Sequence, residues 1–293
     1  MKGFLLGVLL LGSAVSAPAQ DLLNMLEGEA DKTKGPDFAT ATFKTTRLIN
    51  GHSIENVAPG VLDFRISHRF GFVNRGISEF YGLDVSTIRL GLDYGISKRL
   101  MVGLGRSSYQ KQLDAFAKFK ILRQANGGMP LSLSVVSSAM IKTGPYDNPD
   151  RPNYFSSRLY YSWQVLIARK FSEGISLQLM PSVVHYNLVE APEVINDVIA
   201  LGAGGRFKLS KRVSLNLEYY YQLPDHKFTT SYNSLAVGFD IETGGHVFQL
   251  QFTNSTGMTE RTFISETDGN VAKGDIHFGF NISRVFTIKD PRQ

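Results

Sequence analysis

Residues 275–288, at the end of the chain, alternate apolar and polar side chains with a period of two. The apolar set is Ile276, Phe278, Phe280, Ile282, Phe286 and Ile288, and between them lie His277, Gly279, Asn281, Ser283 and Thr287. A period of two places these sets on opposite faces of a β-strand. Further segments repeat the pattern with no helical periodicity between them. Such a series of weak strand signals is typical of a transmembrane β-barrel.

Twelve segments show this alternation and predict twelve strands. They span residues 62–73, 85–96, 99–109, 115–123, 131–141, 157–171, 175–186, 198–209, 213–223, 232–241, 247–254 and 275–288. A water-soluble β-sandwich with its apolar face inward would alternate in the same way. The segment lengths favour the membrane, because a tilted spanning strand needs about 9–11 residues, whereas most strands have about 5–6. Aromatic residues near the strand ends, among them Phe72, Tyr94 and Phe171, favour the interfacial girdles of a barrel.

The connections between these strands alternate in length. Short ones lie at 97–98, 126–129, 172–174, 210–212 and 242–245, and long ones at 74–84, 142–156, 187–197, 224–231 and 255–274; the short connection 110–114 is the exception. Outer-membrane barrels have short periplasmic turns and longer outside loops, so we expect a periplasmic C-terminus. Barrels of this kind have an even number of strands, which agrees with the count of twelve. If residues 38–49 formed a strand as well, the number would have to be fourteen.

The N-terminus has the features of a secretory signal peptide. Lys2 precedes an apolar run at 4–11 and a small-residue site at Ala17-Pro18-Ala19. We therefore expect a signal peptide at 1–19, a periplasmic extension or plug at 20–60, and the barrel at 61–293. No later apolar segment is long enough for a transmembrane helix.

Two features of the composition narrow the function. Cysteine is absent, which excludes disulfides and thiolate chemistry. Loss of Lys2 with the signal peptide lowers the formal net charge of +5 by one, and so mild an excess predicts no nucleic-acid partner. The expected partner is outer-membrane lipid.

The inward phase of the predicted strands carries many charges. The candidate lumen residues are Arg65, Arg69, Arg89, Lys118, Arg206, Lys208, Asp93, Glu218 and Asp240. These charges either pair and fill a small lumen, or line a basic passage that attracts small anionic solutes. Barrels of eight strands are filled and those of sixteen hold a channel, so a width of twelve does not decide between the two.

Several short runs resemble a known family. They are Ile66-Ser67-His68-Arg69-Phe70-Gly71, Gly82-Leu83-Asp84, Arg89-Leu90-Gly91, Thr46-Arg47 and Gly103-x-Gly105-Arg106. Together they resemble a β-barrel family of unknown function from Bacteroidota-type outer membranes. The resemblance implies a barrel in the cell outer membrane, and it brings no known activity or catalytic residues.

No enzymatic motif stands out in the sequence. The histidines form no H-E-x-x-H spacing, and no G-x-S-x-G elbow is present, so we predict neither an enzyme nor a cofactor. His68 and His185 fall on the lipid-facing phase, where a bulge or an interfacial position is expected. The leading hypothesis is a narrow passive pore or small-solute uptake barrel with a basic lumen. The alternatives are a non-conducting barrel that anchors envelope partners, and an outer-membrane lipid-modifying enzyme.

Overall fold

The computed structural model describes residues 37–146, 148–191 and 193–289. The chain divides into two units, Met1–Asp37 and Phe38–Gln293, and the barrel belongs to the second. The predicted signal peptide at 1–19 lies outside the described residues. No helix in the described residues is long and apolar enough to cross a membrane.

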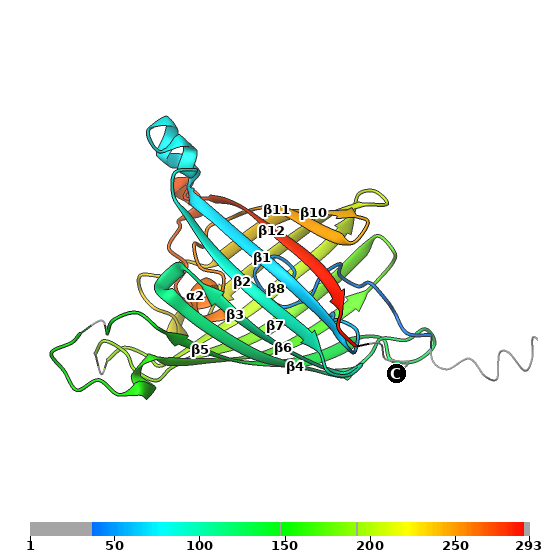
Figure 1. Cartoon of the computed structure of the whole chain (residues 1–293), viewed down its shortest axis with the longest axis horizontal. Helices are drawn as coiled ribbons and strands as arrows, with labels where there is room; N and C mark the ends of the chain where they lie inside the picture. Colours follow the sequence, from blue (N-terminus) through cyan, green and yellow to red (C-terminus); the bar gives the residue numbers. More distant parts are fainter. Residues whose placement is uncertain (1–36, 147, 192, 290–293) are drawn as a thin grey trace, which may run out of the picture. The chain divides into compact units, whose positions relative to one another are not determined.

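Twelve antiparallel strands form a closed barrel, which confirms the predicted fold class (Figure 1). The strands are β1 (Val61–Phe72), β2 (Ser86–Gly95), β3 (Leu100–Ser107), β4 (Gln112–Leu122), β5 (Ser132–Lys142), β6 (Leu159–Lys170), β7 (Ile175–Tyr186), β8 (Asp197–Lys208), β9 (Val213–Gln222), β10 (Ser234–Thr243), β11 (His246–Thr253) and β12 (His277–Thr287). Each strand pairs with its neighbours in sequence, and β1 closes the ring on β12. Residues 38–49 form no strand, so the alternative of fourteen strands is wrong.

Closure removes the free edges that a sheet would otherwise present to lipid. The seam runs from the pair of Val61 with Thr287 to that of Phe72 with His277, with one irregularity after Arg69. Every strand therefore bonds on both sides, as a barrel in hydrocarbon requires, because no water is present there to satisfy peptide groups.

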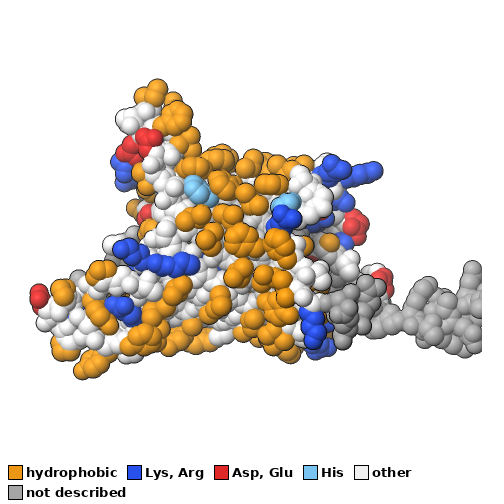
Figure 2. All heavy atoms as spheres, viewed as in Figure 1, with side chains coloured by type: hydrophobic (Ala, Val, Ile, Leu, Met, Phe, Trp, Pro, Cys, Tyr) orange, Lys and Arg blue, Asp and Glu red, His pale blue; other side chains and the backbone are white. Residues whose placement is uncertain are grey.

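The outward face of the barrel is apolar. Leu92, Leu104, Leu179 and Leu250 are each between 43% and 63% exposed. Figure 2 shows hydrophobic side chains over the strands, with Lys and Arg gathered toward the ends. A continuous apolar belt of this kind suits contact with lipid, as the period of two predicted.

The two ends of the barrel differ. The turn end carries the short connections 96–99, 123–131, 171–174, 209–212 and 244–245, and the loop end carries 73–85, 108–111, 143–158, 187–196, 223–233 and 254–276. The loop end holds five 3-10 helices: η1 (Val73–Gly82), η2 (Tyr109–Lys111), η3 (Phe155–Arg158), η4 (Pro224–His226) and η5 (Val271–Lys273). It also holds α2 (Glu260–Ser265), whose six residues are all buried.

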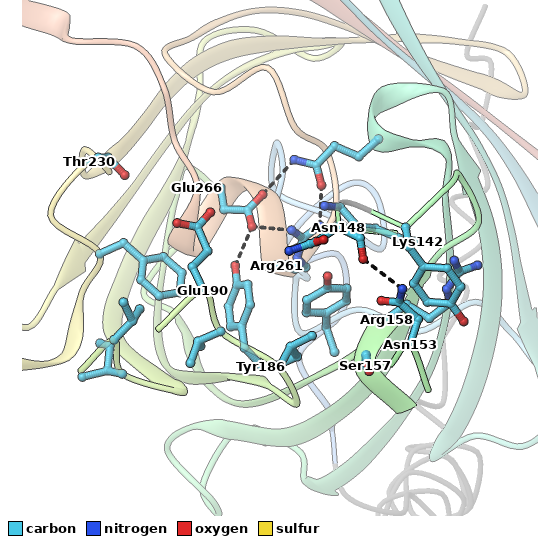
Figure 3. A pocket seen from close by; sticks show the side chains of 18 of the residues that line it. Lys142, Asn148, Asn153, Ser157, Arg158, Tyr186, Glu190, Thr230, Arg261 and Glu266 are labelled. Atoms are coloured by element: carbon cyan, nitrogen blue, oxygen red, sulfur yellow. Dashed lines mark hydrogen bonds and ion pairs between the residues drawn. The ribbon is translucent and has the colours of Figure 1, made fainter. Parts of the chain in front are cut away.

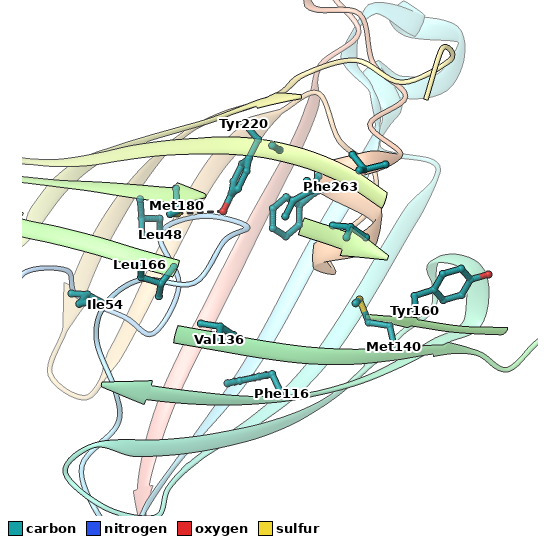
Figure 4. Close-up of a cluster of buried hydrophobic side chains, with 14 of the residues drawn as sticks. Leu48, Ile54, Phe116, Val136, Met140, Tyr160, Leu166, Met180, Tyr220 and Phe263 are labelled. Atoms are coloured by element: carbon teal, nitrogen blue, oxygen red, sulfur yellow. Dashed lines mark hydrogen bonds between the residues drawn. The ribbon is translucent and has the colours of Figure 1, made fainter. Parts of the chain in front are cut away.

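The interior contains a hydrophobic cluster as well as charges (Figure 4). Inward-facing Val136, Leu166, Met180 and Tyr220 are all at most 2% exposed. They pack with apolar side chains from two segments outside the sheet: Leu48, Ile54, Phe263 and Ile264. This cluster could not be predicted from the alternation of apolar and polar residues, because its inward-facing members share their face of the strands with serines and glutamines.

An arginine on the outward face tests the lipid contact. We expect Leu179→Arg, near the middle of β7, to cost about 2–4 kcal/mol of folding free energy, while Leu209→Arg, at the turn end, costs about 0–1 kcal/mol. Denaturant unfolding of the protein in lipid vesicles measures both. Equal effects of the two substitutions would contradict the placement of the membrane.

Candidate functional site

Residues 42–57, called the plug from this point on, fold into a short hairpin. Arg47 and His52 form an antiparallel bridge, and the Leu48 amide donates to the Gly51 carbonyl at 2.9 Å. Gly51 is at the tip, where an added Cβ would lie 2.1 Å from Tyr220 Oη. A side chain at position 51 would force Tyr220 to move, so glycine lets the Asn50-Gly51 turn approach β9 this closely.

Glu218 on β9 binds the tip of the plug through its main chain. Its carboxylate accepts hydrogen bonds from the amides of Ile49 at 3.2 Å, Asn50 at 3.2 Å and Gly51 at 3.0 Å. An irregular turn buried inside a barrel leaves its amides without strand partners. Glu218 supplies the missing acceptor with a full negative charge, which strengthens these bonds.

Lys118 on β4 binds the plug through its main-chain carbonyls, as Glu218 does through the amides. Its ammonium donates to the carbonyl of Thr46 at 3.3 Å, of Ser53 at 2.9 Å and of Glu55 at 2.5 Å. The side chain is fully buried. A buried ammonium needs such partners, because its three donors have no water to bond.

Three wall amides bond further plug carbonyls from other directions. Gln178 donates to His52 at 2.7 Å, Gln249 to Leu48 at 2.6 Å, and Asn281 to Ile49 at 3.2 Å. With Lys118 and Glu218, the contacts come from β4, β7, β9, β11 and β12. Since they surround the plug, the plug lies in the lumen.

Arginines of β1 hold the side chains of the plug. Arg69 Nη2 donates to Asn50 Oδ1 at 2.7 Å, and Arg65 Nη2 donates to Thr46 Oγ1 at 3.2 Å. Thr46 in turn donates to Asp93 at 2.8 Å. These bonds extend the polar network around the plug to β1 and β2.

The connection between β11 and β12 closes the lumen from the loop end. Its helix α2 begins with Glu260, whose Oε1 lies 2.5 Å from Arg47 Nη1 and 3.2 Å from His52 Nε2. Phe263 packs edge-on against Tyr220 at 5.2 Å between ring centroids. The plug and α2 therefore meet inside the barrel in a buried ion pair.

Electrostatics keep this ion pair charged. Burial raises the pKa of the Glu260 carboxyl, but Arg47 and His52 outweigh it and hold that pKa well below its usual range. Burial and then the charge of Arg47 lower the pKa of His52 to about 3, so His52 is neutral at pH 7. The pKa of Glu260 is lower in the folded protein than in the unfolded chain, so its ionised form stabilises the folded state. This contribution to the folding free energy is complete above the usual glutamate pKa, and it is lost as the pH falls toward the lowered pKa.

The structure places eight of the nine predicted lumen residues inside the barrel. Each is at most 4% exposed: Arg65, Arg69, Arg89, Asp93, Lys118, Arg206, Glu218 and Asp240. Lys208 is exposed at the last position of β8, at the turn end. Five of the eight contact the plug: Arg65, Arg69, Asp93, Lys118 and Glu218.

The buried charges of the wall are balanced in sign. Asp63 and Asp114 add to the predicted set, so that five cations and five anions of the described strands are buried. The carboxylate of Asp114 accepts a hydrogen bond from Arg89 Nε at 3.0 Å and a second one from Nη2 of the same guanidinium. Arg206 donates to Ser214 at 3.0 Å, and Asp240 accepts from Gln249 at 2.6 Å.

Sequence reasoning missed three residues that hold the plug or line the wall. Asp114 was assigned to a connection, whereas β4 begins at Gln112. Glu260 was assigned to an outside loop, although Thr259 and Thr262 form a capping box, which is a helix-start signal. Arg47 belongs to a segment without the period of two of the strands, so the alternation gave no reason to place it in the lumen. The only local signal of a hairpin is the Asn50-Gly51 turn that follows it.

The two outward histidines occupy different surroundings. His68 packs between Phe70 at 4.4 Å and Phe280 at 4.9 Å on the outer face. His185, near the loop end of β7, has Nδ1 2.8 Å from Asp197 Oδ1. In the part of the chain that the structure describes, no group of three or more His, Asp or Glu is arranged to hold a metal.

A cavity lies on each side of the plug and α2. The loop-end cavity has a volume of about 870 Å³ and includes Arg158, Glu190, Arg261 and Glu266 in its lining (Figure 3). The turn-end cavity has a volume of about 450 Å³, and its lining includes plug residues 44–46 and 55–57. The lumen is thus hollow at both ends and filled between them.

Comparisons with known proteins agree with this architecture. The family model "Membrane bound beta barrel domain (DUF5777)" matches residues 43–286, which include the plug as well as the barrel. No curated protein matches the chain.

Three solved structures are similar to part of this chain. The NanC porin shares 8% identity over 77% of this chain and 98% of its own, with a TM-score of 0.49. The KdgM porin shares 10% identity over 77% and 99%, with a TM-score of 0.47. The COG4313 outer membrane channel from Pseudomonas putida F1 shares 13% over 79% and 97%, with a TM-score of 0.47.

Removal of the charge on Glu218 tests how the plug is held. A neutral amide is an acceptor about half as strong as a carboxylate, so Glu218→Gln should speed amide hydrogen exchange at residues 49–51 by at least about tenfold. Mass spectrometry of exchanged peptides measures this. Arg206→Gln is the control, because it removes a buried wall charge whose partner, Ser214, belongs to the wall and not to the plug. Equal exchange in both variants would show that Glu218 does not hold the tip.

Proposed function

This chain belongs to the membrane bound beta barrel domain family (DUF5777), and on that premise we propose that it is a narrow outer-membrane channel for small solutes, closed by its own plug. One observation carries the proposal: one barrel has a cavity at each end, and the plug and α2 lie in the lumen between them. Both closing elements lie outside the sheet, so moving them leaves the barrel wall intact. The loop end faces the cell exterior in this proposal, and the turn end faces the periplasm.

Opening requires the buried pair of Arg47 and Glu260 to separate. Truncating one partner of such a pair is strongly destabilising, by about 3–5 kcal/mol, because it leaves the other charge buried and alone. Separation in a lumen that fills with water avoids this penalty, since both ions become hydrated. The plug contacts of Glu218 and Lys118 can be exchanged for water in the same way, because they are hydrogen bonds to main-chain groups.

The charges released on opening favour anionic solutes. Arg89 keeps its partner Asp114, and Arg65 lies 3.6 Å from Asp63, so these cations stay paired without the plug. Arg69 and Lys118 instead lose neutral acceptors, Asn50 and the plug carbonyls. A lumen between low-dielectric walls concentrates the field of such cations. We propose small anionic solutes that bind these two cations, with Glu218 and Asp93, which lose the amides and the Thr46 hydroxyl of the plug, as the opposing charges.

A second function has one observation in its favour. Apolar side chains of the plug and of α2 join those of the wall in a single hydrophobic cluster, which moving the plug would expose. A permanently filled, non-conducting barrel that anchors envelope partners is consistent with this cluster. No catalytic step forms part of either proposal.

Planar-bilayer recording separates the two functions. We expect rare openings of the native protein and an open probability at least about tenfold higher in Glu260→Gln, because Arg47 then lacks its charged partner. Arg206→Gln, which removes a buried wall charge that bonds Ser214 and not the plug, should open as rarely as the native protein. Absence of conductance in every variant at any voltage would overturn the channel and favour the anchor.

A further inference from the structure

The cavity at the loop end has walls of opposite charge. Its lining comes mainly from the connections 143–158, 187–196 and 223–233, above a floor that includes Arg261 and Glu266. In Figure 3, Arg158 and Glu190 lie on opposite sides of this space. A volume of about 870 Å³ is in the range of small-molecule sites.

One wall is basic. Lys142, Arg151 and Arg158 all line it, together with Asn148 and Asn153. Arg158 is held in place, since its guanidinium stacks on Tyr146 at 3.8 Å and donates to the Gly144 carbonyl at 3.2 Å. No carboxylate of the described residues lies within ion-pair distance of Arg151 or Arg158. Planar guanidinium groups positioned in this way suit a carboxylate.

The other wall is acidic and aliphatic. Glu190 and Glu193 are exposed at the cavity, and among the residues described no cation lies within ion-pair distance of either. Half-buried Leu188, Val189 and Ile195 lie beside them. This wall suits an ammonium group next to short apolar side chains.

The charged groups of the floor are already paired with one another. Arg261 pairs with Glu266 and donates to Gln110 Oε1 at 2.5 Å, while Gln110 Nε2 donates to Glu266 at 2.9 Å. Tyr186 donates to Glu266 at 2.9 Å. The backbone of Gln110 is left-handed, with a φ of 52°, which is a strained conformation for a residue other than glycine. The hydrogen bonds of its side chain to Arg261 and Glu266 hold the residue in this conformation. The charges left for a solute are therefore outside the floor: Arg151 and Arg158 on one wall, Glu190 and Glu193 on the other, and exposed Lys227 of the connection 223–233.

The aromatic rings offer little to a sugar. Tyr160 has Arg261 over its face at 3.9 Å and meets Tyr186 edge to face at 5.1 Å, and Tyr146 is covered by Arg158. Tyr160 and Tyr186 are each only 5% exposed. Tyr160 and Tyr186 therefore offer no open face for stacking on a carbohydrate ring, and Arg158 occupies one face of Tyr146.

We propose that this cavity is a binding site for zwitterionic solutes, namely short peptides with free termini. The peptide carboxylate binds the Arg158 wall, its ammonium group binds Glu190 and Glu193, and its side chains contact Val189 and Ile195. The site goes beyond the anionic solutes proposed for the channel, because it adds a zwitterionic class that would enter from the loop end. Binding itself does not depend on conduction, so the two ideas fail separately.

Isothermal titration of the detergent-solubilised full-length protein with trialanine tests the proposal. We expect trialanine to bind, and both N-acetyl-trialanine and trialanine amide to bind at least about tenfold more weakly, since each loses one charged contact. Glu190→Gln combined with Glu193→Gln should weaken trialanine binding to a similar degree, and so should Arg158→Gln alone.

Matched controls lie at the turn end. Glu173→Gln and Arg212→Gln remove exposed charges far from the cavity and should leave trialanine binding unchanged. Binding of N-acetyl-trialanine as tight as that of trialanine would overturn the proposal in favour of a plain anion site. Absence of trialanine binding to the native protein would overturn it as well, whether or not the protein conducts in bilayers.

Discussion

A buried peptide group without a hydrogen-bond partner is costly, and this requirement organises the interior of the barrel. The barrel wall satisfies its own backbone through strand pairing. The plug has one antiparallel bridge, and its own side chains bond only some of the remaining amides and carbonyls, so the others depend on side chains of the wall. Glu218, Lys118, Gln178, Gln249 and Asn281 supply those partners from around the circumference. The polar inward phase of the strands is thus a binding surface for the chain's own N-terminal segment.

The same reasoning explains the charges of the lumen. Buried ions of the wall bond either to other wall groups, as Arg89 does to Asp114, or to groups of the plug, as Lys118 does to three carbonyls. The first kind of contact belongs to the wall itself and the second depends on the plug. In the proposed channel, opening therefore depends on whether water replaces the contacts between wall and plug. The pair of Arg47 and Glu260 is the ionic contact between the plug and α2.

The barrel could be predicted from the sequence because apolar and polar residues alternate in every strand. Twelve such strands of spanning length are typical of a closed transmembrane barrel. The sequence did not predict how the plug is held, since those contacts involve main-chain groups that leave no trace in residue type. Glu218 and Lys118 were predicted only as lumen charges, because their purpose depends on the position of the tip and of the plug carbonyls. Glu260 was hidden for another reason: a six-residue helix inside a long connection is too short for its period to stand out.

The central claim is that the plug occupies the lumen of the native protein. The chain has no cysteine, so a single introduced thiol reports on one position alone. Ser53 in the plug is fully buried, whereas Ser78 in η1 is exposed. The rate at which a small maleimide modifies Ser53→Cys, compared with Ser78→Cys in the same vesicles, measures access to the plug. The account predicts strong protection of position 53 that ends on unfolding; equal rates at the two positions in the folded protein would contradict it.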